Sequence, residues 1–247
     1  MPCRIGANSR CTTNEDPEYF GGESMIPREL LGTATVPGGA ELRLFRRGND
    51  YMIVLDRNEL MSSRMSGSEE ALAVMTIERL RGRAAPHLLI GGYGMGFTLR
   101  AALAALGRDA RLTVAELVPE IIDWARGPMA GLAAGCLDDP RVRVDIADVG
   151  TLIAEASGTY DAILLDVDNG PDGLVRRANN MLYSRSGLAA AKAALKPGGI
   201  LAIWSAAADK PFAKALADAG FAVDEVAVRA RSNGKGAKHV IWFAAKK

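Results

Sequence analysis

The stretch Pro86-His-Leu-Leu-Ile-Gly-Gly-Tyr-Gly-Met-Gly-Phe-Thr-Leu-Arg100 decides the fold of this chain. Its apolar run stops at closely spaced glycines, and a helical pattern begins at Phe97. Glycines allow positive φ angles and a close approach of the backbone to a ligand, and the helix N-terminus then presents unpaired N–H groups. The stretch therefore predicts a strand, a glycine turn that holds a nucleotide-like ligand, and a helix. The glycines of this turn are Gly91, Gly92, Gly94 and Gly96.

Apolar runs alternate with helical segments from this stretch to the end of the chain. Strands are expected at 87–91, 111–116, 141–146, 160–166 and 198–204, and helices at 97–106, 119–127, 148–156, 180–195 and 209–219. Two last strands, 221–228 and 238–244, are close enough in sequence to form a hairpin at a sheet edge. The alternation predicts an α/β fold with a doubly wound, mostly parallel sheet of seven strands.

The residues before the glycine turn have a different pattern. Short alternating runs at 33–36, 41–45 and 51–55, separated by glycine turns, predict a small antiparallel β unit over residues 25–65. The larger unit spans 66–247 and opens with a helix that runs to about residue 81, where Ser66 and Glu69 have the spacing of a capping box. Residues 1–24 are polar, without the apolar core of a signal peptide, and are predicted to be a disordered tail.

The composition argues against several classes of partner. The chain has 30 basic and 29 acidic residues, so no excess charge attracts it to nucleic acid or to a membrane surface. No apolar run has the length of a membrane span. The 3 cysteines lack the spacing of metal ligands, so we expect no metal and a reducing, cytoplasmic location.

Acidic residues follow the predicted strands at the positions where parallel α/β sheets bind ligands. Glu116 ends the second strand, where a carboxylate can accept hydrogen bonds from ribose hydroxyls. Asp148 follows the third strand and is open to two interpretations, an adenine contact or a helix N-cap. Asp166 and Asp168 follow the fourth strand, and we expect Asp166 to face the ligand crevice.

The spacing of the glycines argues against a dinucleotide. The G-x-G-x-x-G/A fingerprint needs a small third residue for close packing of helix on strand. In a register that starts at Gly92 this position is Phe97, and in one that starts at Gly94 it is Leu99. The pattern G-x-G-x-G therefore favours a different nucleoside ligand, and a nicotinamide oxidoreductase remains only a weak alternative.

With these features together, the chain resembles the class I S-adenosylmethionine-dependent transferases, and among them the spermidine synthase (aminopropyltransferase) family. The similarity covers roughly residues 40–245. The segments that carry it are Gly91-Gly-Tyr-Gly-Met-Gly, Val114-Ala-Glu-Leu-Val-Pro, Asp138-Asp-Pro-Arg-Val-Arg-Val, Tyr160-Asp-Ala-Ile-Leu-Leu-Asp, Leu182-Tyr-Ser and Leu195-Lys-Pro-Gly-Gly-Ile-Leu.

The resemblance implies a Rossmann-like methyltransferase fold, a homodimer, and S-adenosylmethionine or decarboxylated S-adenosylmethionine as cofactor. It implies transfer of an aminopropyl or methyl group from the sulfonium to an amine-bearing small molecule. Asp166 and Asp168 would be catalytic, since a carboxylate must orient the amine and help to remove its proton. The cofactor would contact the glycine turn together with Glu116, Leu117, Asp148 and Asp166, and the substrate would contact Glu69, Asp168 and Tyr183.

The chain departs from the family pattern at the transferred group and at the amine. The glycine turn has Tyr93 and Met95 where the family has an aspartate, and the segment Ser66-Gly-Ser-Glu69 keeps only the acid of a Tyr-His-Glu contact. Two alternatives therefore stay open: methyl transfer to a substrate other than a polyamine, and a relative that binds a nucleoside without catalysis. Trp204 is open between pocket lining and core packing, and His239 is expected to be a packing or surface residue.

Overall fold

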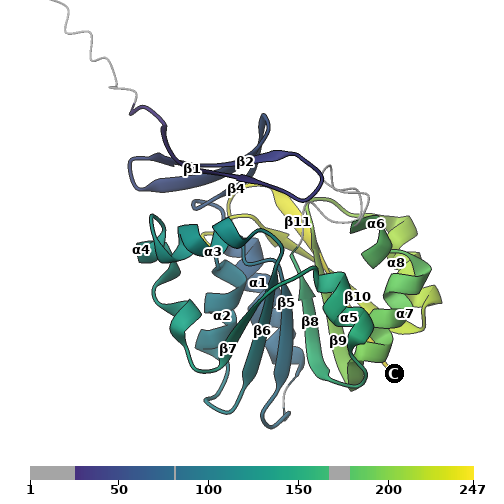
Figure 1. The fold of residues 1–247 in the computed structure, drawn as a ribbon. Coiled ribbons are helices and arrows are strands. Elements are labelled where there is room, and N and C mark those ends of the chain that lie inside the picture. Colours follow the sequence, from purple (N-terminus) through teal and green to yellow (C-terminus); the bar gives the residue numbers. More distant parts are fainter. Residues whose placement is uncertain (1–25, 81, 167–178) are drawn as a thin grey trace, which may run out of the picture.

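The computed structural model describes residues 26–80, 82–166 and 179–247. The predicted disordered tail, 1–24, lies outside these residues. The described part has two sheets, and Figure 1 shows the smaller, N-terminal sheet lying across one end of the larger sheet.

The larger sheet has seven strands in the order β10-β11-β9-β8-β5-β6-β7. Its strands are β5 (His87–Gly91), β6 (Arg111–Glu116), β7 (Val142–Ile146), β8 (Tyr160–Leu165), β9 (Leu195–Ser205), β10 (Phe221–Arg229) and β11 (Lys238–Lys246). The pairs from β7 to β9 are parallel, and β11 pairs antiparallel with both β9 and β10. The predicted fold class and the predicted final hairpin are therefore confirmed. The strand order reverses between β5 and β8, so the ends of these two strands flank the ligand crevice of this fold.

Helices cover both faces of the larger sheet. They are α1 (Gly67–Arg79), α2 (Phe97–Ala105), α3 (Pro119–Arg126), α5 (Val149–Glu155), α7 (Arg185–Ala194) and α8 (Lys210–Asp218), with short turns α4 (Ala130–Ala133), η1 (Cys136–Asp138) and α6 (Asn179–Leu182). One apolar cluster joins α1, α2 and α3 to one face, and a second joins α5, α7 and α8 to the other. In β8, Ala162 and Leu164 belong to the first cluster, and Ile163 and Leu165 belong to the second. This alternation explains why the strand is apolar at every one of these positions.

The N-terminal sheet has the strand order β1-β2-β3-β4 and is entirely antiparallel. Its strands are β1 (Glu29–Thr35), β2 (Glu41–Arg47), β3 (Asp50–Leu55) and β4 (Asn58–Ser62). The sequence predicted the first three strands and missed β4, which is short and has no clear alternation. Buried residues of this sheet, such as Leu42 and Ile53, share a cluster with those of the larger sheet. The boundary at residues 65 and 66 between two domains stays a prediction.

Two local predictions were wrong. The helix expected at 180–195 is interrupted, because Ser184 adopts an extended conformation and its Oγ accepts the backbone N–H of Gly187 at 3.1 Å, which starts α7 anew. The capping box at the start of α1 does not form, because Ser66 is helical and makes no capping bond with its side chain. The backbone N–H of Gly67 instead donates to the oxygen of Ala230 at 2.9 Å.

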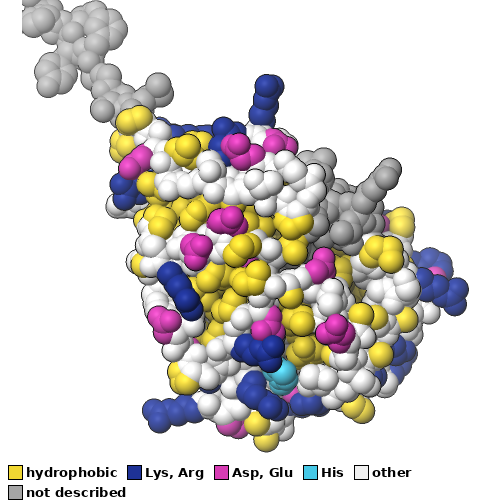
Figure 2. All heavy atoms as spheres, viewed as in Figure 1, with side chains coloured by type: hydrophobic (Ala, Val, Ile, Leu, Met, Phe, Trp, Pro, Cys, Tyr) yellow, Lys and Arg dark blue, Asp and Glu magenta, His cyan; other side chains and the backbone are white. Residues whose placement is uncertain are grey.

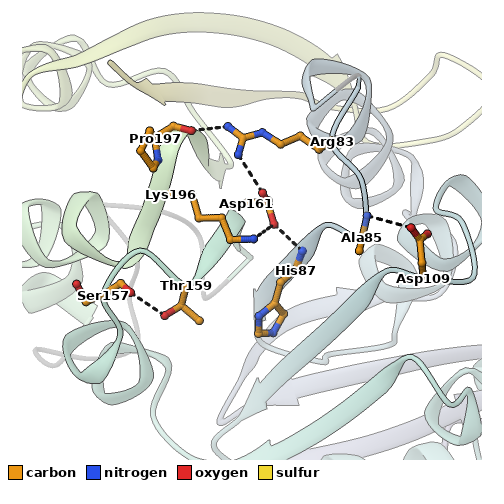
Figure 3. Close-up of polar contacts among 9 residues, drawn as sticks. All are labelled: Arg83, Ala85, His87, Asp109, Ser157, Thr159, Asp161, Lys196 and Pro197. Carbon is orange, nitrogen blue, oxygen red and sulfur yellow. Dashed lines mark hydrogen bonds and ion pairs between the residues drawn. The ribbon is translucent and has the colours of Figure 1, made fainter.

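A buried carboxylate holds together the end of the sheet opposite the N-terminal sheet. Asp161 is 2% exposed and accepts the backbone N–H of His87 at 2.8 Å (Figure 3). It also pairs with Arg83 at 3.1 Å and with Lys196 at 2.5 Å. Burial alone would raise the pKa of Asp161, but the His87 N–H and the two cations outweigh it and hold this pKa below its usual value. The carboxylate thus joins the segment after α1 to β5, β8 and β9.

We predict that Asp161→Asn lowers the free energy of unfolding by about 2 kcal/mol at neutral pH, because it leaves two cations short of a partner. This stabilisation is present above the ordinary pKa of aspartate and is lost as the pH falls through the lower pKa of the folded state. Urea unfolding at several pH values measures it. Asp224→Asn is the control, since its ion pair with Arg79 is exposed and is expected to contribute less than about 0.5 kcal/mol. Equal effects of the two substitutions would contradict the assignment.

Candidate functional site

A cavity of about 350 Å³ lies between the two sheets, at the carboxyl ends of the parallel strands. On the face drawn in Figure 2, hydrophobic side chains gather in a band beneath the N-terminal sheet, with acidic side chains among them. The N-terminal sheet and its first turn supply a mostly apolar wall: Val36, Leu42, Ile53, Leu55, Glu59, Leu60, Met61 and Ser62. The opposite wall consists of the loops after the parallel strands and the start of α1.

The glycine turn after β5 forms one part of this opposite wall. Gly92 and Gly94 line the cavity with φ angles of 87° and 55°, which favour glycine. A Cβ atom at Gly94 would lie 2.6 Å from Cε of Met61, so the turn and the N-terminal sheet are in close contact there. Tyr93 and Met95 are 4% and 1% exposed, and the Tyr93 hydroxyl lies 3.5 Å from Sγ of Cys136. Of the two residues that replace the family's acid, Met95 is packed in the core, whereas Tyr93 is buried and also lines the cavity.

Glu116 fixes the glycine turn to the end of β6. Its Oε2 accepts the backbone N–H of Tyr93 at 2.8 Å, and its Oε1 accepts those of Leu117 at 2.8 Å and Val118 at 2.9 Å. Burial raises the pKa of Glu116, although these N–H groups favour the charged form. Glu116 and Leu117 both line the cavity. Three acceptor positions of the Glu116 carboxylate are therefore occupied by backbone N–H groups. Its contact with ribose hydroxyls stays a prediction.

Asp148 has one of the two roles that the sequence left open. Its Oδ1 accepts the backbone N–H of Gly150 at 2.7 Å, which caps the N-terminus of α5. The residue also lines the cavity, next to Ala147 and Val149. The N-cap interpretation is thus confirmed, and contact with an adenine amino group remains a prediction.

Two carboxylates share the centre of the cavity wall. Asp166 follows β8 and is partly buried, and Glu69, from the first turn of α1, is 8% exposed. The hydroxyl of Thr98, on α2, donates to Oδ2 of Asp166 at 3.2 Å and lies 3.4 Å from the backbone oxygen of Glu69. Three segments far apart in the sequence therefore meet at this point.

Burial raises the pKa of both carboxylates. It raises the pKa of Asp166 to about 6, against the hydrogen bond from Thr98, which lowers it. Burial also raises the pKa of Glu69 well above its usual value, and the negative charge of Asp166 raises it further. Two neighbouring carboxylates with raised pKa values are stabilised in their charged forms by a cation placed beside them.

A third part of the wall lies beyond Asp166, on the side of β9 and β11. Trp204, near the end of β9, and His239, near the start of β11, both line the cavity. Their rings meet edge to face with centroids 4.7 Å apart, and Nδ1 of His239 lies 2.9 Å from Oγ of Ser68. Burial lowers the pKa of His239. The sequence analysis did not place His239 or Ser68 at the site, because the pairing of β11 with β9 brings His239 to Trp204 and the packing of α1 brings Ser68 to His239.

Two further substrate contacts were predicted, at Asp168 and Tyr183. Asp168 lies outside the described residues. Tyr183 lies in the apolar cluster of α5, α7 and α8, where its ring packs edge-on against Phe212 with centroids 5.4 Å apart, and it does not line the cavity. Contact of Tyr183 with a substrate stays a prediction.

Among residues 26–80, 82–166 and 179–247, no three His, Cys, Asp or Glu side chains come together as metal ligands would. Within the same ranges, every helix is too short or too polar to cross a bilayer.

Comparisons with a family model and with curated proteins point to the same family. The family model of the spermine/spermidine synthase domain matches residues 73–215. A polyamine aminopropyltransferase from Mycobacterium tuberculosis is 30% identical over 166 residues, which cover 66% of this chain and 30% of the relative. Another from Corynebacterium efficiens is 29% identical over 207 residues, which cover 83% of this chain and 36% of that protein. The chain thus spans about a third of the length of these curated relatives.

Solved structures share the fold. A spermidine synthase from Thermotoga maritima superposes with a TM-score of 0.69 at 18% identity, over 88% of this chain and 72% of that chain. A spermidine synthase in complex with the transition state analogue AdoDATO superposes with a TM-score of 0.67 at 19% identity, with the same coverage. Because the family model matches more than half of the sequence, the chain belongs to the spermine/spermidine synthase family.

Proposed function

We propose that the chain transfers an aminopropyl group from decarboxylated S-adenosylmethionine to the amine of a small molecule. The observation that carries this proposal is the pair of Asp166 and Glu69 on the wall of the cavity, next to the glycine turn. Membership of the family and the names of the curated relatives support it. The homodimer implied by the resemblance stays part of the proposal.

The glycine turn, Glu116 and Asp148 form the end of the cavity that would hold the nucleoside. Gly92 and Gly94 have no side chains, so their backbone is bare where they line the cavity. Glu116 holds this turn in place, and Leu117 and Val149 offer apolar contacts for a flat ring. The residues present therefore fit a nucleoside at the β5 and β6 side of the sheet.

Asp166 and Glu69 would bind the incoming amine and take its proton. An amine is a nucleophile only when neutral, and ionised Asp166 can accept the proton that the nitrogen loses as its new bond to carbon forms. The amine nitrogen forms a bond to the carbon next to the sulfonium, while the carbon–sulfur bond breaks and its electron pair stays on sulfur. Alignment of nitrogen, carbon and sulfur supplies much of the rate enhancement.

Methyl transfer from intact S-adenosylmethionine is the second candidate. It is favoured by one observation: the glycine turn has no acid, and Tyr93 and Met95, both buried, stand in its place. Assays with each sulfonium, followed by mass spectrometry of the product amine, distinguish an added aminopropyl group from an added methyl group. Calorimetry in which NAD binds and neither sulfonium binds would overturn both candidates.

We predict that Asp166→Asn keeps the affinity for 5′-methylthioadenosine and lowers kcat by about 10²–10⁴-fold, because the amide cannot accept a proton. Calorimetry measures the first quantity, and product formation from decarboxylated S-adenosylmethionine measures the second. Asp123→Asn, on the exposed face of α3, is the control and is expected to leave both unchanged. Undiminished turnover in Asp166→Asn would remove Asp166 from the mechanism.

We predict an acidic limb in the pH dependence of kcat/KM. The reaction needs the deprotonated form of Asp166, so the rate falls as the pH drops through about 6. Thr98→Val removes the hydrogen bond that lowers this pKa, so the limb moves to higher pH. Thr113→Val is the control, because the Thr113 hydroxyl contacts His87, away from the cavity. A limb that stays in place in Thr98→Val would show that another group titrates.

A further inference from the structure

The β9 and β11 side of the cavity has a histidine that the proposed reaction does not use. His239 lines the cavity and is partly exposed. Its ring is held on two sides, since it meets the ring of Trp204 edge to face and its Nδ1 lies 2.9 Å from Oγ of Ser68. Burial lowers the pKa of His239, so the imidazole is neutral near neutral pH. A neutral ring in a fixed orientation recognises a ligand through a hydrogen bond rather than through charge.

Nε2 is the nitrogen of this ring that a ligand can reach. No described residue forms a hydrogen bond with it. If the protein enclosed Nε2, it would be a buried polar atom without a partner, and within the described part of the chain no ring atom of His239 is such an atom. Nε2 is therefore accessible. Because Ser68 occupies the Nδ1 side, Nε2 is the nitrogen that His239 offers to a ligand.

Ser68 decides which nitrogen carries the hydrogen of the neutral ring. Ser68 is 1% exposed, and among the described residues its hydroxyl has one hydrogen-bond partner, Nδ1 of His239. A buried hydroxyl hydrogen needs an acceptor, and Nδ1 is an acceptor only when it carries no hydrogen. The ring hydrogen is then on Nε2, so Nε2 is a donor.

A donor at Nε2 limits the group that a ligand can place there. An ammonium group only donates hydrogen bonds, so the second ammonium of a diamine does not fit. A carboxylate accepts, but the charged lining residues disfavour an anion, because those in the described part of the chain are all acidic. They are Glu59, Glu69, Glu116, Asp148 and Asp166. A hydroxyl oxygen accepts and has no charge, so it fits best.

His239 lies on the side of the cavity away from the proposed nucleoside. Strand β9 lies between β8, which Asp166 follows, and β11, which starts next to His239. Two strand spacings, about 10 Å, therefore separate β8 from β11. The glycine turn and Glu116 follow β5 and β6, on the other side of β8. A molecule whose amine reaches Asp166 from the β9 side extends its remaining atoms toward His239.

We propose that the acceptor substrate is an amine with a hydroxyl group at its far end, and that Nε2 of His239 donates a hydrogen bond to this hydroxyl. Ser68 is a positioning residue that keeps the ring hydrogen on Nε2. The substrate class is then an amino alcohol rather than a bare diamine. This inference rests on the proposed function for the role of Asp166, and it adds the identity of the acceptor.

The binding experiment compares amines that differ only at the far end: butylamine, 4-aminobutan-1-ol and 1,4-diaminobutane, and the same three compounds with a five-carbon chain. Calorimetry with the full chain, saturated with 5′-methylthioadenosine, measures the affinity of each. In the wild type we expect the better amino alcohol to bind about three- to tenfold more tightly than its alkylamine, the effect of one hydrogen bond. His239→Phe keeps a ring beside Trp204 without the nitrogens and is expected to abolish this preference.

His87→Phe is the matched control. The ring of His87 also packs against an aromatic ring, that of Tyr160, with centroids 4.9 Å apart, and its Nε2 lies 3.0 Å from Oγ1 of Thr113. His87 starts β5, at the opposite end of the sheet, and does not line the cavity. This variant is therefore expected to keep the preference for the amino alcohol.

A spectroscopic measurement tests the position of the ring hydrogen in the wild type. The chain has 2 histidines, so nitrogen NMR of the imidazole rings gives two sets of signals, and the set that changes in Ser68→Ala belongs to His239. We expect the hydrogen on Nε2 at neutral pH. A hydrogen on Nδ1 overturns the proposal, and this test does not depend on whether His239→Phe folds.

The remaining outcomes separate this inference from the proposed function. Tightest binding of the diamines, unaffected by His239→Phe, overturns the inference and leaves aminopropyl transfer to a diamine intact. If His239→Phe weakens 5′-methylthioadenosine but not the amino alcohols, Nε2 binds the donor, and the assignment to the acceptor is wrong. Failure to bind 5′-methylthioadenosine and both sulfonium compounds overturns the proposed function, and the inference with it.

Discussion

The burial of the central sheet on both faces is the constraint on which the rest of this structure depends. Successive residues of β8 belong to opposite apolar clusters, so helices must cover each face. Polar ligands can then approach the sheet only at its ends. One end is closed by the ion pairs of Asp161, and the other carries the cavity. The N-terminal sheet closes this cavity from above with mostly apolar side chains.

The residues that line the cavity differ in character from one side of the sheet to the other. Its β5 and β6 side offers bare backbone and a buried carboxylate that holds the glycine turn. Its centre has two carboxylates with raised pKa values, and its β9 and β11 side has the rings of Trp204 and His239.

The sequence predicted the larger sheet well and its local details less well. Strands β5 and β6 lie at the predicted residues, because unbroken apolar runs between turn signals define buried parallel strands. The helix at 180–195 and the capping box at Ser66 were wrong, since both depend on which backbone groups a hydroxyl can reach. For the same reason, the sequence left Asp148 open between an adenine contact and a helix N-cap. The structure shows that Asp148 caps the N-terminus of α5.

By itself, the sequence determined the fold class, the glycine turn and the acids that follow the strands, because these features follow from local periodicity and from the rule that the carboxyl ends of parallel strands share one edge. Only the tertiary structure decided that Glu69 stands beside Asp166, and that Ser68 and His239 meet Trp204. These contacts join residues up to 171 positions apart. They depend on the insertion of β11 between β9 and β10 and on the packing of α1 against the sheet, which no local pattern encodes.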